Sequence, residues 1–146
     1  MTDHDAWLAQ VTEETIEPGR PIVDPHHHLW HHKETPYLLP DLWADTNSGH
    51  NIEQTVFIDC AAEYRTSGPE ALRPVGETEF AVEVAAEAAK GPDSAARIGA
   101  IIGHADLMLG DAVGDVLAAH TEAGNGLFRG IRHAAGWDAS EVVRNS

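Results

Sequence analysis

The chain contains 146 residues, with 24 Asp and Glu against 9 Lys and Arg, so its formal net charge is -15. The length fits one ordinary domain with its own core, and a charged fraction of 23% is typical of globular proteins. The acidic balance excludes a nucleic-acid or anionic-membrane surface, because binding phosphates requires clustered Lys and Arg. We expect neither a membrane-spanning helix nor a secretory signal, because no long apolar run is present and the start is acidic. The single Cys60 excludes an internal disulfide, so we expect a cytoplasmic protein.

The Pro18-Gly19 dipeptide is typical of a turn and predicts a boundary in the chain at this point. Residues 1–19 are predicted to form an N-terminal leader and residues 20–146 to form one domain. From there, strands and helices alternate in the pattern of βαβ units, which predicts an α/β protein with a parallel sheet. The expected elements, in order, are strand 21–26, helix 42–47 capped by Asp41, strand 54–60, helix 77–90, strand 97–103, a helix capped by Asp111 and ending near 123, strand 127–133, and the start of a further helix within 134–146.

Each predicted strand ends in polar residues that can bind a ligand. In α/β folds the carboxyl ends of parallel strands meet at one edge of the sheet, where functional groups collect. The sequence therefore predicts one shared site. Its candidate residues are Asp24, His26 and His28 after the first strand, Asp59, Cys60 and Glu63 after the second, His104 and Asp106 after the third, and Arg132 and His133 after the fourth.

Five of the ten histidines lie within seven positions, and the triplet at 26–28 directly follows the first strand. Because side chains two apart on a strand share a face, His26 and His28 point one way and His27 the other. Two imidazoles on one face can reach a single zinc ion, and Asp24 is placed to orient one of them. The alternative is a histidine-rich surface loop. A catalytic zinc needs a third protein ligand, for which His133, His104 and Asp59 are the open candidates.

The other histidines of the cluster, His31 and His32, are expected in a loop at the mouth of the site. Arg132 is a rare cation at a strand end, and we expect it to bind a substrate carboxylate. The alternative for Arg132 is a structural ion pair with an acidic residue. Cys60 is expected to be a buried thiol, because the sequence offers it no base partner.

Four ordered segments of the sequence resemble the amidohydrolase 2 family of predicted metal-dependent hydrolases, in its lactonase-like branch. These segments are Ile22-Val23-Asp24-Pro25-His26-His27-His28-Leu29-Trp30, Thr55-Val56-Phe57-Ile58-Asp59-Cys60, Arg73-Pro74-Val75-Gly76-Glu77-Thr78-Glu79-Phe80 and Phe128-Arg129-Gly130-Ile131-Arg132-His133. The resemblance extends from about Asp5 onward. It implies a (β/α)8 TIM barrel, of which this chain would provide about four βα units, because such barrels have about 250 residues. We therefore expect residues 20–146 to be the N-terminal half of a barrel.

The resemblance also implies an activity. His26 and His28 would be catalytic ligands of a divalent metal, with zinc the expected ion, although some relatives need none. The metal-activated water would open a carboxylated or sugar-acid lactone, a small-molecule substrate held by Arg132 and His133. Two alternatives stay open at this point. One is a decarboxylase on the related barrel, and the other is a catalytically silent half-barrel that self-associates as a homo-oligomer.

Overall fold

The structure is a computed structural model and describes residues 6–7, 9–31 and 34–143. Its elements are β1 (Pro21–His27), α2 (Leu39–Thr46), β2 (Asn51–Ile58), the short 3-10 helix η1 (Glu70–Leu72), α3 (Val75–Ala88), β3 (Arg97–His104), the 3-10 segment η2 (Leu107–Ala112), α4 (Val113–Ala123) and β4 (Phe128–Arg132). No helix within these ranges has both the length and the apolar character that crossing a membrane requires.

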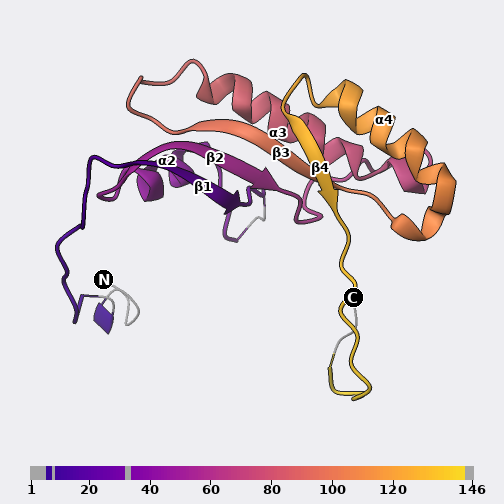
Figure 1. The fold of residues 1–146 in the computed structure, drawn as a ribbon, viewed down its shortest axis with the longest axis horizontal. Coiled ribbons are helices and arrows are strands. Elements are labelled where there is room, and N and C mark those ends of the chain that lie inside the picture. The colour runs from indigo at the N-terminus through magenta and orange to yellow at the C-terminus, as the bar shows by residue number, and fades with distance from the viewer. Residues whose placement is uncertain (1–5, 8, 32–33, 144–146) are drawn as a thin grey trace.

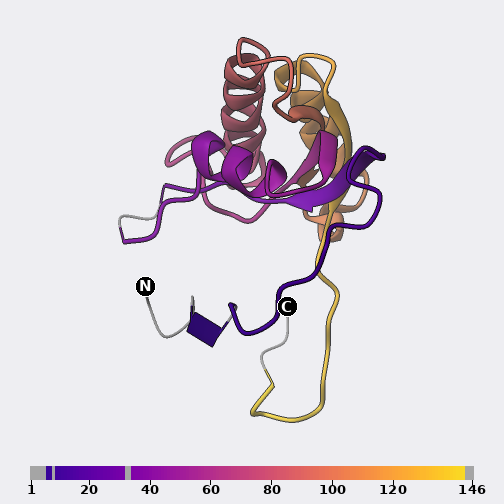
Figure 2. The same cartoon turned by 90° about the vertical axis from the view of Figure 1, so that its left-hand side faces the viewer.

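The four strands form a single parallel sheet in the order β1-β2-β3-β4. Each strand therefore pairs with the next strand in the sequence. Because the strands are parallel, every connection crosses back from the carboxyl end of one strand to the amino end of the next. Helices α3 and α4 lie side by side over one face of the sheet, and none of the labelled helices of the described residues lies over the opposite face (Figure 1, Figure 2). The predicted α/β class and its parallel sheet are confirmed.

The hydrophobic core fills the space between the sheet and its helices. Phe57 of β2 is 1% exposed, and Ile101 of β3 is fully buried beside it in the register. They pack against the small residues of α3, which let the helix approach the sheet closely. Members of this core are Leu29, Leu39, Leu42, Phe57, Ala81, Val84, Ala85, Ala88, Ile98 and Ile101.

Two predicted helix caps are wrong. Asp41 lies inside the first turn of α2, where its carboxylate accepts a hydrogen bond from the Leu38 amide at 2.9 Å. The helix starts earlier than expected because Pro40 fits its first turn, where no amide hydrogen is needed. Asp111 lies within η2, and α4 begins only after Ala112, which provides no side-chain cap.

Other boundaries also differ from the sequence expectations. Helix α3 begins at Val75, two residues before the predicted start, directly after Pro74. Strand β2 covers 51–58 instead of 54–60, so Asp59 and Cys60 lie just beyond its end. The described residues from 134 to 143 contain no helix. The strand prediction placed the polar residues correctly at the edge of the sheet, and this edge contains the candidate site.

Candidate functional site

His26 and His28 lie together at the carboxyl end of β1. Their Nε2 atoms are 3.1 Å apart, and their rings meet edge to face at 88°. This separation is shorter than twice the usual Zn–N distance of about 2.0–2.1 Å, so both nitrogens can reach one ion. The alternation predicted from the sequence is therefore present in the structure.

The neighbouring strand fixes the orientation of His28. Its Nδ1 lies 2.7 Å from the carbonyl oxygen of Ile58, the last residue of β2. A carbonyl only accepts, so Nδ1 of neutral His28 carries the hydrogen, and its Nε2 lone pair faces His26, from whose Nε2 it accepts a hydrogen bond. A second hydrogen bond of this kind is what metal-binding histidines normally have. The donor chemistry of the pair fits a divalent metal.

Two other residues of this strand have roles that differ from a ligand's. The Asp24 carboxylate accepts a hydrogen bond from the backbone amide of His26 at 3.0 Å, so it shapes the chain before the pair and, in the part of the chain that the structure describes, hydrogen-bonds to neither imidazole of the pair. His27 points to the opposite face, where it is 7% exposed and packs edge to face on Phe57. Burial lowers the pKa of His27 to about 4, and both its ring nitrogens are without a hydrogen-bond partner among the described residues. His27 is therefore a neutral core residue.

A third metal ligand is not found among the described residues, which contain no group of three or more His, Cys, Asp or Glu side chains arranged to hold an ion. The candidates His104, His133 and Asp59 do not join the His26–His28 pair in such a group. His31, expected at the mouth, pairs through Nδ1 with Glu63 Oε1 at 2.7 Å. His32 lies outside the described residues.

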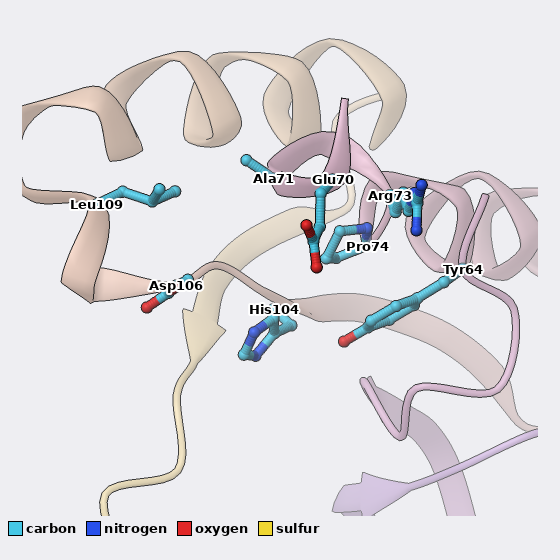
Figure 3. A pocket seen from close by; sticks show the side chains of 8 residues that line it. All are labelled: Tyr64, Glu70, Ala71, Arg73, Pro74, His104, Asp106 and Leu109. Carbon is cyan, nitrogen blue, oxygen red and sulfur yellow. The ribbon is translucent and has the colours of Figure 1, made fainter. Parts of the chain in front are cut away.

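A cleft opens where β2, β3 and β4 end, at the same edge of the sheet as the histidine pair. It contains both residues predicted to bind substrate, Arg132 and His133. Its lining residues are Asp59, Cys60, Ala61, Tyr64, His104, Arg132, His133 and Ala134. An adjoining cavity of about 680 Å³ shares Tyr64 and His104, which lie across it from Glu70, Ala71 and Pro74 (Figure 3). The two hollows provide room for a small molecule beside the strand ends.

Arg132 reaches the cleft and also has an acidic neighbour. Its Nε is 3.9 Å from Oδ1 of Asp59, and the Arg132 side chain is 45% exposed while that of Asp59 is 6% exposed. The same Oδ1 accepts a hydrogen bond from the Tyr64 hydroxyl at 3.4 Å. Arg129 instead donates to the carbonyl oxygens of Gly126 and Phe128. Of these two arginines, only Arg132 lines the cleft, and its contact with Asp59 through Nε leaves the terminal nitrogens to bind a substrate.

The two cleft histidines adopt opposite tautomers. His104 Nδ1 donates to the Arg132 carbonyl at 3.1 Å, which leaves its Nε2 as a free acceptor. His133 Nδ1 accepts from the Leu107 amide at 2.9 Å, so the hydrogen of neutral His133 is on Nε2. Asp106 Oδ1 is 3.8 Å from the same Nδ1, but a nitrogen that accepts an amide hydrogen forms no ion pair there. The cleft therefore offers one imidazole acceptor and one imidazole donor.

Behind the cleft lies a buried acid that sequence reasoning missed. Glu77, in the first turn of α3, is 1% exposed, and its Oε1 accepts from the amide and the thiol of Cys60 at 3.0 and 3.3 Å. Burial raises the pKa of the Cys60 thiol to about 12, with Glu77 adding to the effect. Cys60 is thus a protonated hydrogen-bond donor, but it is half-buried at the cleft and not the buried thiol that was predicted.

A sequence signal for Glu77 did exist. It lies four, seven and eleven residues before Ala81, Val84 and Ala88, so it continues the buried stripe of α3. A buried acid on such a stripe requires a hydrogen-bond donor, and Cys60, just after the end of β2, provides it. Tyr64 lies in an irregular loop, and nothing in its spacing pointed to the cleft.

The fold and the site together define an α/β protein with an imidazole pair and a polar cleft at the carboxyl edge of a parallel sheet. Comparison with family models, with curated proteins and with solved structures finds no match to this chain. The amidohydrolase 2 resemblance stays a prediction from sequence motifs.

Proposed function

We propose that this chain is a metal-dependent hydrolase of the amidohydrolase 2 type that opens carboxylated or sugar-acid lactones. The observation that carries the proposal is the His26–His28 pair, with Nε2 atoms 3.1 Å apart and His28 fixed by the Ile58 carbonyl. A pair arranged in this way suits metal binding better than a surface loop, whose imidazoles have no reason to converge.

We also propose that the sheet is part of a (β/α)8 barrel. Parallel strands in sequential order with their helices on one face are what a barrel requires, whereas a doubly wound sheet reverses its order and has helices on both faces. In a barrel the helix-free face would be the interior, and the strand ends would surround the active site.

In the proposed reaction, His26 and His28 hold the metal, with zinc as the expected ion. When bound, such an ion supplies an activated water and polarises the ester carbonyl. The terminal nitrogens of Arg132 bind the substrate carboxylate, and Asp59 fixes the guanidinium from its Nε side. His133 donates from Nε2 to a substrate oxygen, and His104 accepts a substrate hydroxyl at its free Nε2.

A lactone-hydrolysis assay on the full chain tests this function. With 5-oxotetrahydrofuran-2-carboxylate as the substrate, we expect proton release in a pH-stat to depend on zinc and to stop with a chelator. The double variant His26→Ala, His28→Ala should be inactive, while His50→Ala, an exposed histidine just before β2, should match the unmodified chain. Equal hydrolysis in the double variant would overturn the proposal. Release of carbon dioxide from the substrate would favour the decarboxylase, and no reaction at all would favour the catalytically silent half-barrel.

A further inference from the structure

Two buried acids meet directly behind the cleft. Asp59 is 4% exposed and Glu77 is 1% exposed, and Asp59 lies close enough to Glu77 to raise its pKa. Each has one oxygen, Oδ2 of Asp59 and Oε2 of Glu77, that is buried without a hydrogen-bond partner among the described residues. Two ionised carboxylates cannot bond to each other, and an unpartnered buried anion is costly.

One proton resolves the conflict. If Glu77 Oε2 carries it and donates to Asp59 Oδ2, both unpartnered oxygens are satisfied and the pair has a single negative charge. Burial, with a smaller contribution from the neighbouring Asp59, raises the pKa of Glu77 to about 7. Two carboxyl groups in contact are known to share one proton in this way, because both cannot ionise side by side.

The remaining oxygens of the two acids connect α3 to the cleft. Glu77 Oε1 accepts from the Cys60 amide and thiol, which fixes its carboxyl at the end of β2. Asp59 Oδ1 faces the cleft, where it accepts from the Tyr64 hydroxyl and lies 3.9 Å from Arg132 Nε. The contacts thus run from Glu77 through Asp59 to the guanidinium of Arg132.

We propose that Glu77 is a positioning residue: it holds Asp59 by a shared proton, and Asp59 in turn aims the Arg132 guanidinium into the cleft to bind a substrate carboxylate. This rests on the carboxylate-binding part of the proposed function. Loss of the shared proton places two charges side by side, which displaces Asp59 and weakens the grip of Arg132. Carboxylate binding should therefore decline as the pH rises through neutrality.

Other titratable groups surround the contacts from Glu77 to Arg132, and their titration would also change carboxylate binding. They are Cys60 and Tyr64 from the β2 end and its loop, His104 and His133 in the cleft, and His120, whose charge is sensitive to Asp59. The Glu77→Gln variant separates the effect of Glu77 titration from the effects of all these groups. Its amide donates to Asp59 Oδ2 at every pH, so the other groups titrate but the link to Asp59 stays intact.

The test measures binding of 2-furoate, an unreactive cyclic carboxylate, to the full chain by NMR titration at pH 6 and pH 8. We expect affinity to drop several-fold between these pH values in the unmodified chain and to drop much less in Glu77→Gln. Arg132→Ala should lose about tenfold in affinity at pH 6, the usual cost of one charge-assisted hydrogen bond, while Arg129→Ala should bind as the unmodified chain does.

Identical pH dependence in Glu77→Gln and the unmodified chain would overturn the inference. Unchanged binding in Arg132→Ala would instead contradict the carboxylate-binding role of the proposed function, so the two failures are distinct. If Glu77→Gln does not fold, carbon-13 NMR of the unmodified chain decides: we expect one buried carboxyl to remain protonated at pH 6, and full ionisation of every carboxyl at that pH would refute the shared proton.

Discussion

The Glu77→Gln variant is expected to gain stability over the unmodified chain as the pH rises from 4.5 to 7, by on the order of 3 kcal/mol in total. Burial raises the pKa of Glu77 from 4.5 to about 7 in the folded protein. Above pH 4.5 the unfolded chain releases this proton while the folded chain retains it, so the contribution of Glu77 to stability declines up to pH 7 and is then constant. A glutamine has no such proton. Urea denaturation at a series of pH values measures the difference.

His27→Leu is the matched variant, because it should change the pH profile in the opposite sense. Burial lowers the pKa of His27 from 6.5 to about 4, so its stabilising contribution is present above pH 6.5 and is lost as the pH falls toward 4. Leucine removes this loss and also removes two unpartnered ring nitrogens. Parallel pH profiles for Glu77→Gln and the unmodified chain would show that Glu77 is ionised in the fold.

Phe57→Ala is expected to lower the free energy of unfolding by about 3–5 kcal/mol, the usual cost of truncating a buried phenylalanine. Phe57 is 1% exposed, and its ring centroid lies 5.7 Å from that of His27. It immediately precedes Ile58, whose carbonyl holds His28, so the cavity should also loosen the histidine pair. The urea midpoint at constant pH measures the effect.

Met108→Ala provides the control for this substitution, because Met108 is 86% exposed in η2. A surface change of this kind should alter stability by less than about 0.5 kcal/mol. A loss of less than about 1 kcal/mol in Phe57→Ala would show that the residue is not part of a close-packed core.

The strands were predictable because their apolar and β-branched runs end in polar residues at one edge of the sheet. Local patterns were less informative at the helix starts. Asp41 and Asp111 have the residue type of a cap, but Pro40 in α2 and the extra 3-10 turn before α4 determine where these helices begin. Such effects depend on the path of the whole loop, which composition alone does not reveal.

At the site, alternation along a strand sufficed to place His26 and His28 together and His27 in the core. The contacts that orient these groups were not predictable, because they join residues far apart in the sequence. His28 meets Ile58 across β1 and β2, and Glu77 meets Asp59 across a helix and a strand. Only the register of the sheet and the docking of α3 bring these partners together.

The most direct test of the account is a calorimetric titration of the full chain with zinc. We predict binding by the unmodified chain and by His50→Ala. His26→Ala and His28→Ala should each lose more zinc affinity than the roughly 10–100-fold that follows removal of a residue hydrogen-bonded to a metal ligand. Failure of the unmodified chain to bind zinc, or equal affinity in the His26→Ala, His28→Ala double variant, would contradict the assignment of this pair as a metal site.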